Sequence, residues 1–310
     1  MTAELPIIGL DIGGSKTAAG LVDPDGQVIR RSQAYTPARD GRDAILKAAE
    51  RLATEVRAGQ PITGVGIGSA GVIAGGRVVA ATSLLADWAG TDLVRYFTEA
   101  LGVLDPKPTI AAINDVHAHG VGEAWCGAGA GNDCALVVAV GTGLGGVVVE
   151  RGWPLVGANG VAGHLGHIAS PAATDLPCSC GAVGHLDAIA SGYGLLQLYR
   201  RLGGDPIVPD SREVSARLGR DRYADQAVRL SATALGSALG DVINIIDPDV
   251  VIISGGVAGA GSVWWDRMRE ATASAALPLV AETPVVPATL GPDAGVIGAA
   301  RYVLNIVAGR

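Results

Sequence analysis

Apolar and polar residues follow two kinds of pattern along this chain. Short apolar runs bounded by glycine, such as residues 6–10 and 135–140, are typical of buried β-strands. Residues 43–57 and 227–246 carry apolar side chains at spacings of three and four, which predicts amphipathic helices. Further strands are expected at 62–67, 109–113 and 249–253, and a closing helix at 295–307. Strands that alternate with helices indicate an α/β fold.

Two glycine-rich turns are flanked by strands in the same way. One is Asp11-Ile12-Gly13-Gly14-Ser15-Lys16-Thr17 and the other is Gly141-Thr142-Gly143-Leu144-Gly145-Gly146. Each opens one half of the chain, so the repeat predicts two related domains that join near residues 117–132. The length of 310 residues agrees with two domains.

Composition narrows the class of protein. The chain has 46 glycines, which is about twice the usual share of roughly 7%. It has no collagen period, and its apolar content of 49% is too high for a disordered chain. A net charge of −7 with no run of Lys or Arg argues against a nucleic-acid partner. We find neither a signal peptide nor a membrane span, and therefore expect a cytoplasmic protein with no membrane partner.

Glycine turns suit phosphate, because glycine lets backbone N–H groups approach a ligand closely. Three such turns occur, at residues 11–17, 141–146 and 254–256. They match neither the P-loop pattern nor the dinucleotide pattern of a strand followed by a helix. Two related glycine hairpins would instead suit a nucleotide held between two domains.

Asn114-Asp115 ends a predicted strand and precedes a predicted helix. A carboxylate in this place can reach a substrate hydroxyl at the edge of an interdomain cleft. It can also cap the following helix, which is the commoner role of such an aspartate. The pair alone leaves both roles open.

His167, Cys178, Cys180 and His185 are spaced as H-x10-C-x-C-x4-H. This set of nitrogen and sulfur ligands suits a structural, tetrahedral Zn²⁺ site. The alternative is two reduced cytosolic thiols and two unrelated histidines. A disulfide between the two cysteines is not expected in a reducing compartment.

These motifs, in this order, resemble the ROK sugar kinases of the actin-like, hexokinase-type ATPase superfamily. The resemblance extends over nearly the whole chain and includes Gly157–His167, Cys178–Asp187 and Ser254–Gly256. It implies two actin-like (ribonuclease H-like) ATPase domains with a cleft between them. The expected domains are residues 1–118 with the C-terminal helix 294–310, and residues 119–293.

By this resemblance Asp115 is the general base that accepts the proton of the attacking sugar hydroxyl. Asp11 would face Mg²⁺ through water, and Lys16 is either a phosphate contact or a solvated side chain. The expected ATP-binding and phosphate-binding residues are Asp11, Gly13, Gly14, Ser15, Lys16, Gly141, Thr142, Gly143, Gly145, Gly255 and Gly256.

The expected sugar-binding residues are Gly68, Gly71, Asn114, Asp115, His164, His167 and Asp187. Four positions depart from the family pattern. His164 stands where the ROK glucokinases have Glu, and Asp187 stands where they have a second Glu. Leu84 replaces the family's Asn four residues before Trp88. His185 replaces the last Cys of the zinc knuckle, which is the segment 167–185 that carries the four predicted zinc ligands.

The resemblance therefore implies an ATP-dependent kinase for the 6-hydroxyl of an N-acetylhexosamine, with N-acetylmannosamine first because of His164. Glucose and N-acetylglucosamine are the alternative sugars, and polyphosphate is an alternative donor. A homodimer is also expected by resemblance. ROK regulators carry an additional helix-turn-helix, for which the ten residues before Asp11 leave no room. An actin-like structural ATPase is disfavoured by the sugar loop at residues 68–71 and by the zinc knuckle.

Overall fold

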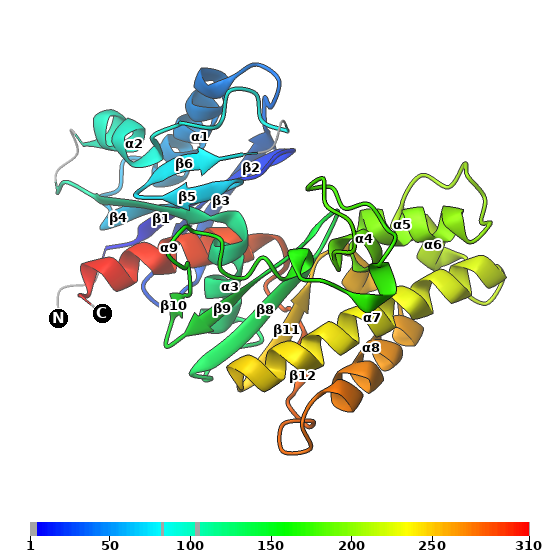
Figure 1. The fold of residues 1–310 in the computed structure, drawn as a ribbon. Coiled ribbons are helices and arrows are strands. Elements are labelled where there is room, and N and C mark those ends of the chain that lie inside the picture. The colour runs from blue at the N-terminus through cyan, green and yellow to red at the C-terminus, as the bar shows by residue number, and fades with distance from the viewer. Residues whose placement is uncertain (1–4, 82–83, 103–105, 310) are drawn as a thin grey trace. The chain divides into compact units, whose positions relative to one another are not determined.

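The computed structural model describes residues 5–81, 84–102 and 106–309 and has the α/β architecture expected from the sequence (Figure 1). Its contacts divide the chain into two compact units. The first comprises Met1–Asp133, Val147–Ala162 and Thr289–Arg310, and the second comprises Cys134–Gly146 and Gly163–Ala288. The domain boundaries expected from the sequence group the residues differently and stay a prediction.

The first unit is built on a five-stranded sheet with the order β3-β2-β1-β4-β7. Strands β1, β4 and β7 are parallel, and β1, β2 and β3 form an antiparallel meander. The strands of the sheet are β1 (Ile7–Ile12), β2 (Lys16–Val22), β3 (Val28–Tyr35), β4 (Gly64–Ser69) and β7 (Thr109–Asn114). A separate hairpin consists of β5 (Val72–Ala74) and β6 (Arg77–Ala80).

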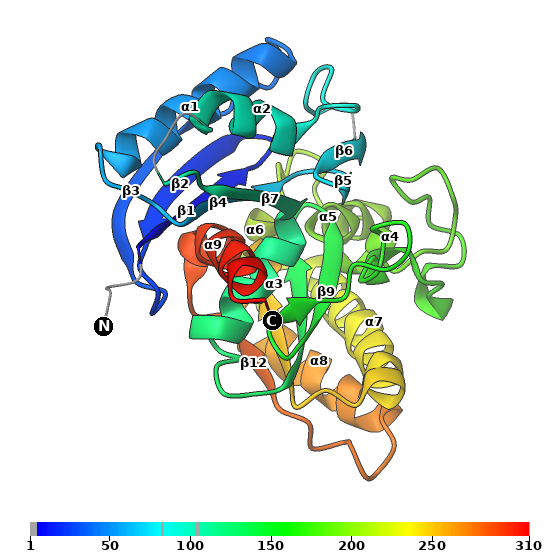
Figure 2. The same ribbon diagram turned by 90° about the vertical axis from the view of Figure 1, so that its left-hand side faces the viewer.

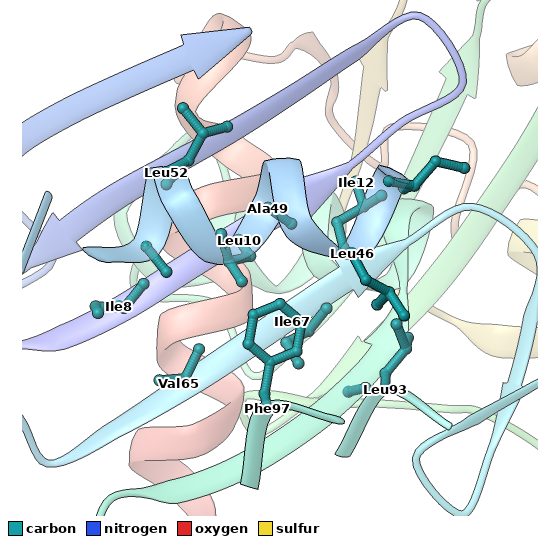
Figure 3. Close-up of a cluster of buried hydrophobic side chains, with 14 of the residues drawn as sticks. Ile8, Leu10, Ile12, Leu46, Ala49, Leu52, Val65, Ile67, Leu93 and Phe97 are labelled. Carbon is teal, nitrogen blue, oxygen red and sulfur yellow. The ribbon is translucent and has the colours of Figure 1, made fainter. Parts of the chain in front are cut away.

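Helices cover both faces of this sheet, as Figure 2 shows. Helices α1 (Arg42–Arg57) and α2 (Leu93–Leu101) lie on one face, and α3 (Asp115–Cys126) and α9 (Ala294–Val307) lie on the other. The stripe of apolar residues on α1 meets the side chains of β1 and β4 in a core that also contains Phe97 (Figure 3). This core fixes the strands whose carboxyl ends carry Asp11, Ser69 and Asn114.

Helix α9 lies close to the backbone of β1 and β4 because both strands carry glycine where it crosses them. A Cβ atom on Gly66 would overlap the carbonyl of Ala299, and one on Gly9 would overlap the carbonyl of Val296. Part of the excess glycine therefore serves helix-on-sheet packing rather than ligand binding.

The second sheet has the order β10-β9-β8-β11-β12, and β11 is parallel to β8 and β12. Its strands are β8 (Cys134–Val140), β9 (Leu144–Glu150), β10 (Trp153–Pro154), β11 (Val250–Ser254) and β12 (Val285–Pro287). The division between the two units passes within β9. The helices of the second unit are α4 (Asp187–Ala190), α5 (Gly192–Arg201), α6 (Ser211–Ala216), α7 (Arg222–Ile246) and α8 (Ser262–Ala275). Helices α7 and α8 lie side by side (Figures 1 and 2).

The predicted elements are confirmed, with shifted ends. The two arrangements of strand, glycine turn and strand are β1–β2 and β8–β9. The helix expected at 227–246 begins at Arg222, because the carboxylate of Asp221 caps its first turn, and it ends at Asp247 in the left-handed conformation. The elements that were not predicted include strands β3, β5, β6, β10 and β12 and helices α2, α4, α5, α6 and α8. In the part of the chain that the structure describes, we find no helix with the length and hydropathy of a membrane span.

Candidate active site

Asp115 is the first residue of α3, directly after the end of β7. The helix cap is Asn114, whose Oδ1 accepts hydrogen bonds from the backbone N–H groups of Val116 (2.9 Å) and His117 (3.2 Å). Asp115 contributes one further bond, from Val116 N–H to its Oδ1 (3.0 Å). The structure therefore assigns the capping role to Asn114, and the carboxylate of Asp115 is available for chemistry.

Asn114 also connects the predicted base to the predicted sugar loop. Its Nδ2 donates to the carbonyl of Gly71 (2.9 Å) and to Oδ1 of Asp115 (2.9 Å). Its amide thus makes four hydrogen bonds within the protein, which is the full number for an amide group. In this structure Asn114 positions its neighbours, and its predicted contact with sugar stays a prediction.

The predicted sugar loop at residues 68–71 is also held by Trp88. The buried indole Nε1 donates to Ser69 Oγ (3.1 Å) and to the carbonyl of Ala70 (3.2 Å). Gly71 has a φ of 105°, which only glycine adopts without strain. Leu84, at the position of the family's asparagine, is 73% exposed.

Asp11 lies near the end of β1, against the first turn of α9. A Cβ atom on Gly295 would come within 2.7 Å of Asp11 Oδ2, so only glycine leaves room for this carboxylate. Burial, followed by the charge of Asp115, raises the pKa of Asp11 to about 7. Burial likewise raises the pKa of Asp115, against the lowering effect of the hydrogen bonds that it accepts. Two half-buried carboxylates, close enough for the charge of Asp115 to raise the pKa of Asp11, favour a cation beside them.

The turn after Asp11 is a tight β-hairpin. Gly13 N–H donates to the carbonyl of Lys16 (3.0 Å), and Thr36 Oγ1 donates to the carbonyl of Gly13 (2.8 Å). Gly14 lies in the same turn, and Ser15 and Lys16 are exposed. The turn therefore presents backbone and a lysine to solvent, as a phosphate contact requires.

In the second unit the turn at 141–146 borders a cavity of about 500 Å³. Thr142 and Gly256 line it, together with Tyr193, Asp210 and Arg212. The last three were not predicted, because each lies on a segment that only the fold brings to the glycine turn. Gly255 has a φ of 90° and lies against the carbonyl of Val140, so a side chain would not fit there. Gly143 belongs to the same turn, and Gly145 lies in β9.

The four predicted zinc ligands lie together. Their ligand atoms are all within 4.8 Å of one another. Cys178 Sγ is 3.7 Å from His167 Nδ1, and Cys180 Sγ is 3.2 Å from His185 Nδ1. Tetrahedral Zn²⁺ with bonds of about 2.0–2.3 Å requires ligand atoms separated by roughly 3.3–3.8 Å. Two of the pairs lie close to this separation, so the set is a candidate zinc site in which His185 takes the place of a cysteine.

His164 and Asp187 have different surroundings. His164 is exposed at the start of the 3₁₀ turn Leu165–His167, and its ring centroid is 6.2 Å from that of His167. Asp187 is 5% exposed, and its carboxylate accepts hydrogen bonds from Leu144 N–H (2.8 Å) and Ser179 Oγ (3.2 Å). The predicted residues thus form one group around Asp11 and Asp115 in the first unit and another around the glycine turn and knuckle in the second.

Comparison with known families decides the class of this protein. The family model described as ROK family matches residues 7–306. The chain belongs to the ROK family. The resemblance to ROK sugar kinases that the motifs indicate is thereby confirmed.

Individual relatives agree with this assignment. The chain is 31% identical to a glucokinase of Thermotoga maritima, with 99% of each chain covered. It is 32% identical to an N-acetylmannosamine kinase of Yersinia pseudotuberculosis, with 95% of this chain and 97% of the relative covered. A solved ROK family glucokinase of Streptomyces griseus, in complex with glucose and AMPPNP, has a TM-score of 0.78 and 29% identity, covering 96% of this chain and 98% of that one. The ROK fold expected from the sequence is confirmed by this match.

The knuckle generates a prediction about metal content. Purified protein should contain about one equivalent of zinc per chain, because four ligands converge on one point. Elemental analysis measures this directly. Cys178→Ser should lose the metal, whereas Cys134→Ser, a control outside the cluster, should keep it. Folded wild-type protein without zinc would contradict the assignment.

The raised pKa of Asp11 predicts how stability changes with pH. The folded state holds a proton on Asp11 up to about pH 7, whereas an unfolded aspartate loses it near pH 4. Folded protein thus binds more protons in this window, so Asp11 lowers stability progressively as pH rises from about 4 to about 7. In magnesium-free buffer, Asp11→Asn should raise Tm by a few degrees at pH 8, and the gain should be smaller at pH 5.

Thermal unfolding of both proteins from pH 5 to pH 8 measures this difference. Asp40→Asn, at an exposed aspartate of the same unit, is the control and should leave Tm unchanged. A gain in Tm that is equal at pH 5 and pH 8 would exclude titration of Asp11 as its cause.

Proposed function

We propose that this ROK protein is an ATP-dependent kinase that phosphorylates the 6-hydroxyl of an N-acetylhexosamine, with N-acetylmannosamine as the first candidate. The observation that carries the proposal is the position and the raised pKa of the Asp115 carboxylate. Its carboxylate is half-buried at a strand end and has a raised pKa, while its neighbour Asn114 caps the helix. Since Asn114 supplies the cap, Asp115 is not needed for that role.

Asp115 acts as the general base in this proposal. Phosphoryl transfer requires mainly that the attacking oxygen be oriented and that charge be neutralised. The carboxylate accepts a hydrogen bond from the sugar 6-hydroxyl and takes its proton as the bond from this oxygen to the γ-phosphorus forms. The bond from the γ-phosphorus to the β–γ bridging oxygen breaks in the same step, and ADP leaves. A raised pKa makes the carboxylate a better proton acceptor near neutral pH. Asn114 holds the carboxylate in place through Nδ2.

ATP binding is proposed for the glycine turns. The turn at 13–16 and the turn at 141–145 supply backbone N–H groups to the phosphates, and Gly255 and Gly256 approach the adenosine. The cavity beside Thr142 and Gly256 has the volume that a nucleoside needs. The Streptomyces griseus relative was solved with AMPPNP, which supports ATP as the donor.

Mg²⁺ is proposed beside Asp11, because burial and the charge of Asp115 raise the pKa of this carboxylate and a cation there would favour its ionised form. When bound, Mg²⁺ would neutralise charge on the transferring phosphates. Asp11 would hold the ion through water, and Gly295 leaves the space that the carboxylate needs.

The sugar preference is proposed from His164. A neutral imidazole offers one hydrogen-bond donor and one acceptor, whereas a glutamate offers only acceptors. The donor suits the carbonyl of an N-acetyl group. Glucose is the second candidate, because a glucokinase and an N-acetylmannosamine kinase resemble the chain about equally, at 31% and 32% identity.

Zinc in the knuckle completes the proposal. His167, Cys178, Cys180 and His185 would hold it, and it would fix the turn that presents His164. A homodimer in the cytoplasm remains our prediction for the assembly and its location.

Activity should appear in an assay of N-acetylmannosamine, N-acetylglucosamine and glucose, each with ATP and with polyphosphate. N-acetylmannosamine with ATP should give the highest kcat/KM. Asp115→Asn should lower kcat by about 100- to 10,000-fold, because the base is lost, while the Kd values for sugar and nucleotide stay near those of the wild type.

Asp40→Asn is the matched control for this variant and should keep full turnover. Substantial kcat in folded Asp115→Asn protein would refute the role of the base. A wild-type protein with no activity on any sugar of the panel would refute the kinase proposal itself.

His164 should decide the sugar preference. His164→Glu should shift the ratio of kcat/KM values from N-acetylmannosamine towards glucose by about 10-fold or more, since it replaces a donor by charged acceptors. His164→Gln keeps one donor and one acceptor and should retain the wild-type preference. An unchanged ratio in His164→Glu would show that the imidazole does not select the N-acetyl group.

A further inference from the structure

Glu123 is a buried carboxylate that the proposed mechanism does not use. It lies near the end of α3 and is 0% exposed. Its Oε1 accepts the backbone N–H groups of Thr289 (3.2 Å) and Leu290 (2.9 Å). Its Oε2 accepts those of Ala128 (3.1 Å) and Thr289 (3.1 Å). Hydrogen bonds to a charged acceptor are among the strong ones in proteins, so this side chain holds three backbone groups in place.

The three N–H groups belong to two segments that are far apart in sequence. Ala128 lies in the stretch through which the chain leaves the first unit, and Thr289 is the residue at which the chain returns to it. The backbone carbonyl of Glu123 also accepts the N–H groups of Gly127 (3.1 Å) and Gly129 (3.0 Å). One residue therefore fixes both the outgoing and the returning segment to the end of α3.

The returning segment leads within a few residues to the start of α9. Leu290 is followed by the 3₁₀ turn Gly291–Asp293, and α9 begins directly after this turn. Gly295, in the first turn of α9, has no side chain and so leaves room for the carboxylate of Asp11. A shift of Leu290 would therefore displace the turn of the helix that borders Asp11.

The packing of α3 against α9 leaves no slack to absorb such a shift. The two helices lie side by side (Figures 1 and 2). A Cβ atom on Gly122 would come within 2.2 Å of the carbonyl of Ala294, the first residue of α9. Closely packed elements move as bodies rather than deform. The place at which α9 begins along α3 thus determines where Asp115, at the start of α3, lies relative to Asp11.

On the basis of the proposed kinase function, we propose that Glu123 is a positioning residue for phosphoryl transfer. It fixes the start of α9 to the end of α3 and thereby holds Asp11 and Asp115 at the separation that the reaction requires. The predicted sugar loop is held by Trp88, and the glycine turn at 141–146 is held by the start of α5. Turnover, rather than binding of sugar or nucleotide, is therefore the quantity that Glu123 controls.

Steady-state kinetics of the full chain, with ATP and the best sugar of the panel, measure this role. Glu123→Gln keeps the length of the side chain but has one acceptor oxygen, so its NH₂ group must face the N–H of either Ala128 or Leu290. The variant should lower kcat by about 10- to 100-fold, because small displacements of reacting groups are costly. The KM values for sugar and ATP should change by less than about 2-fold.

Two variants of the first unit are matched controls. Glu50→Gln makes the same substitution on α1, where the carboxylate accepts the hydroxyl of Tyr96 (2.6 Å), and should keep full turnover. Asn305→Ala, in the last turns of α9, removes a buried hydrogen bond to the carbonyl of Gly152 (2.9 Å). It should lower Tm by a few degrees without lowering kcat, and so separates a loss of stability from a loss of positioning.

A second variant displaces the carboxylate without altering it. A Cβ atom on Gly127 would come within 2.1 Å of Oε2 of Glu123, so Gly127→Ala should lower kcat in the same way as Glu123→Gln. Because both changes act on one carboxylate, the double variant should lose little more than the larger of the two single losses. Gly127→Ala also carries the test if Glu123→Gln does not fold.

Folded Glu123→Gln protein with the kcat of the wild type would overturn the proposal, as would a raised KM with an unchanged kcat. Losses of kcat that multiply in the double variant would also overturn it, and so would an equal loss of kcat in Asn305→Ala.

Failure of the sugar kinase proposal shows differently, as wild-type protein with no turnover on any sugar of the panel. Hydrogen exchange at residues 289–298 still tests Glu123 in that case. Exchange there should be faster in Glu123→Gln than in the wild type and in Glu50→Gln, because the start of α9 is released. Equal exchange in all three proteins would overturn the proposal.

Discussion

Close contact between backbones is the constraint on which the rest of the first unit depends. Helix α9 can lie against β1 and β4 only because Gly9 and Gly66 carry no side chain. This contact brings the first turn of the last helix to the end of the first strand, where Gly295 borders the carboxylate of Asp11. The geometry around Asp11 is therefore built from both ends of the chain. A chain with 46 glycines uses many of them in this way, and not only in turns that face ligands.

In both units, polar side chains that are hydrogen-bonded within the protein hold the predicted site residues and loops in place. Asn114 makes four hydrogen bonds, Trp88 holds the loop at 69–70, and Asp187 connects two loops. Each buried donor or acceptor must be paired, since an unpaired one costs free energy. Pairing therefore ties each of these residues to particular neighbours, so that a site built of turns keeps a defined shape.

Unlike these paired groups, the carboxylates of Asp11 and Asp115 lower the stability of the folded protein when they are charged. Burial raises the pKa of both, and the charge of Asp115 raises that of Asp11 further, so the folded protein carries two carboxylates in a place that disfavours their charge. Such strain is typical of functional sites, where charge is held ready for a cation or a proton. The stability given up here is compatible with the large apolar core that α1 and α2 form on the opposite face of the sheet.

The sequence by itself determined the features that are local in the chain. The two glycine hairpins, the strand that ends at Asn114-Asp115 and the four residues of the knuckle each lie within a few to about twenty residues, so spacing and residue type reveal them. Motif order then identified the family. The tertiary structure alone decided which of the pair Asn114 and Asp115 caps α3, and which groups Asp187 binds. It also decided which distant segments, such as Tyr193 and Arg212, line the cavity beside Thr142. These partners are far apart in sequence, and their contacts arise only when the helices pack, so no local pattern records them.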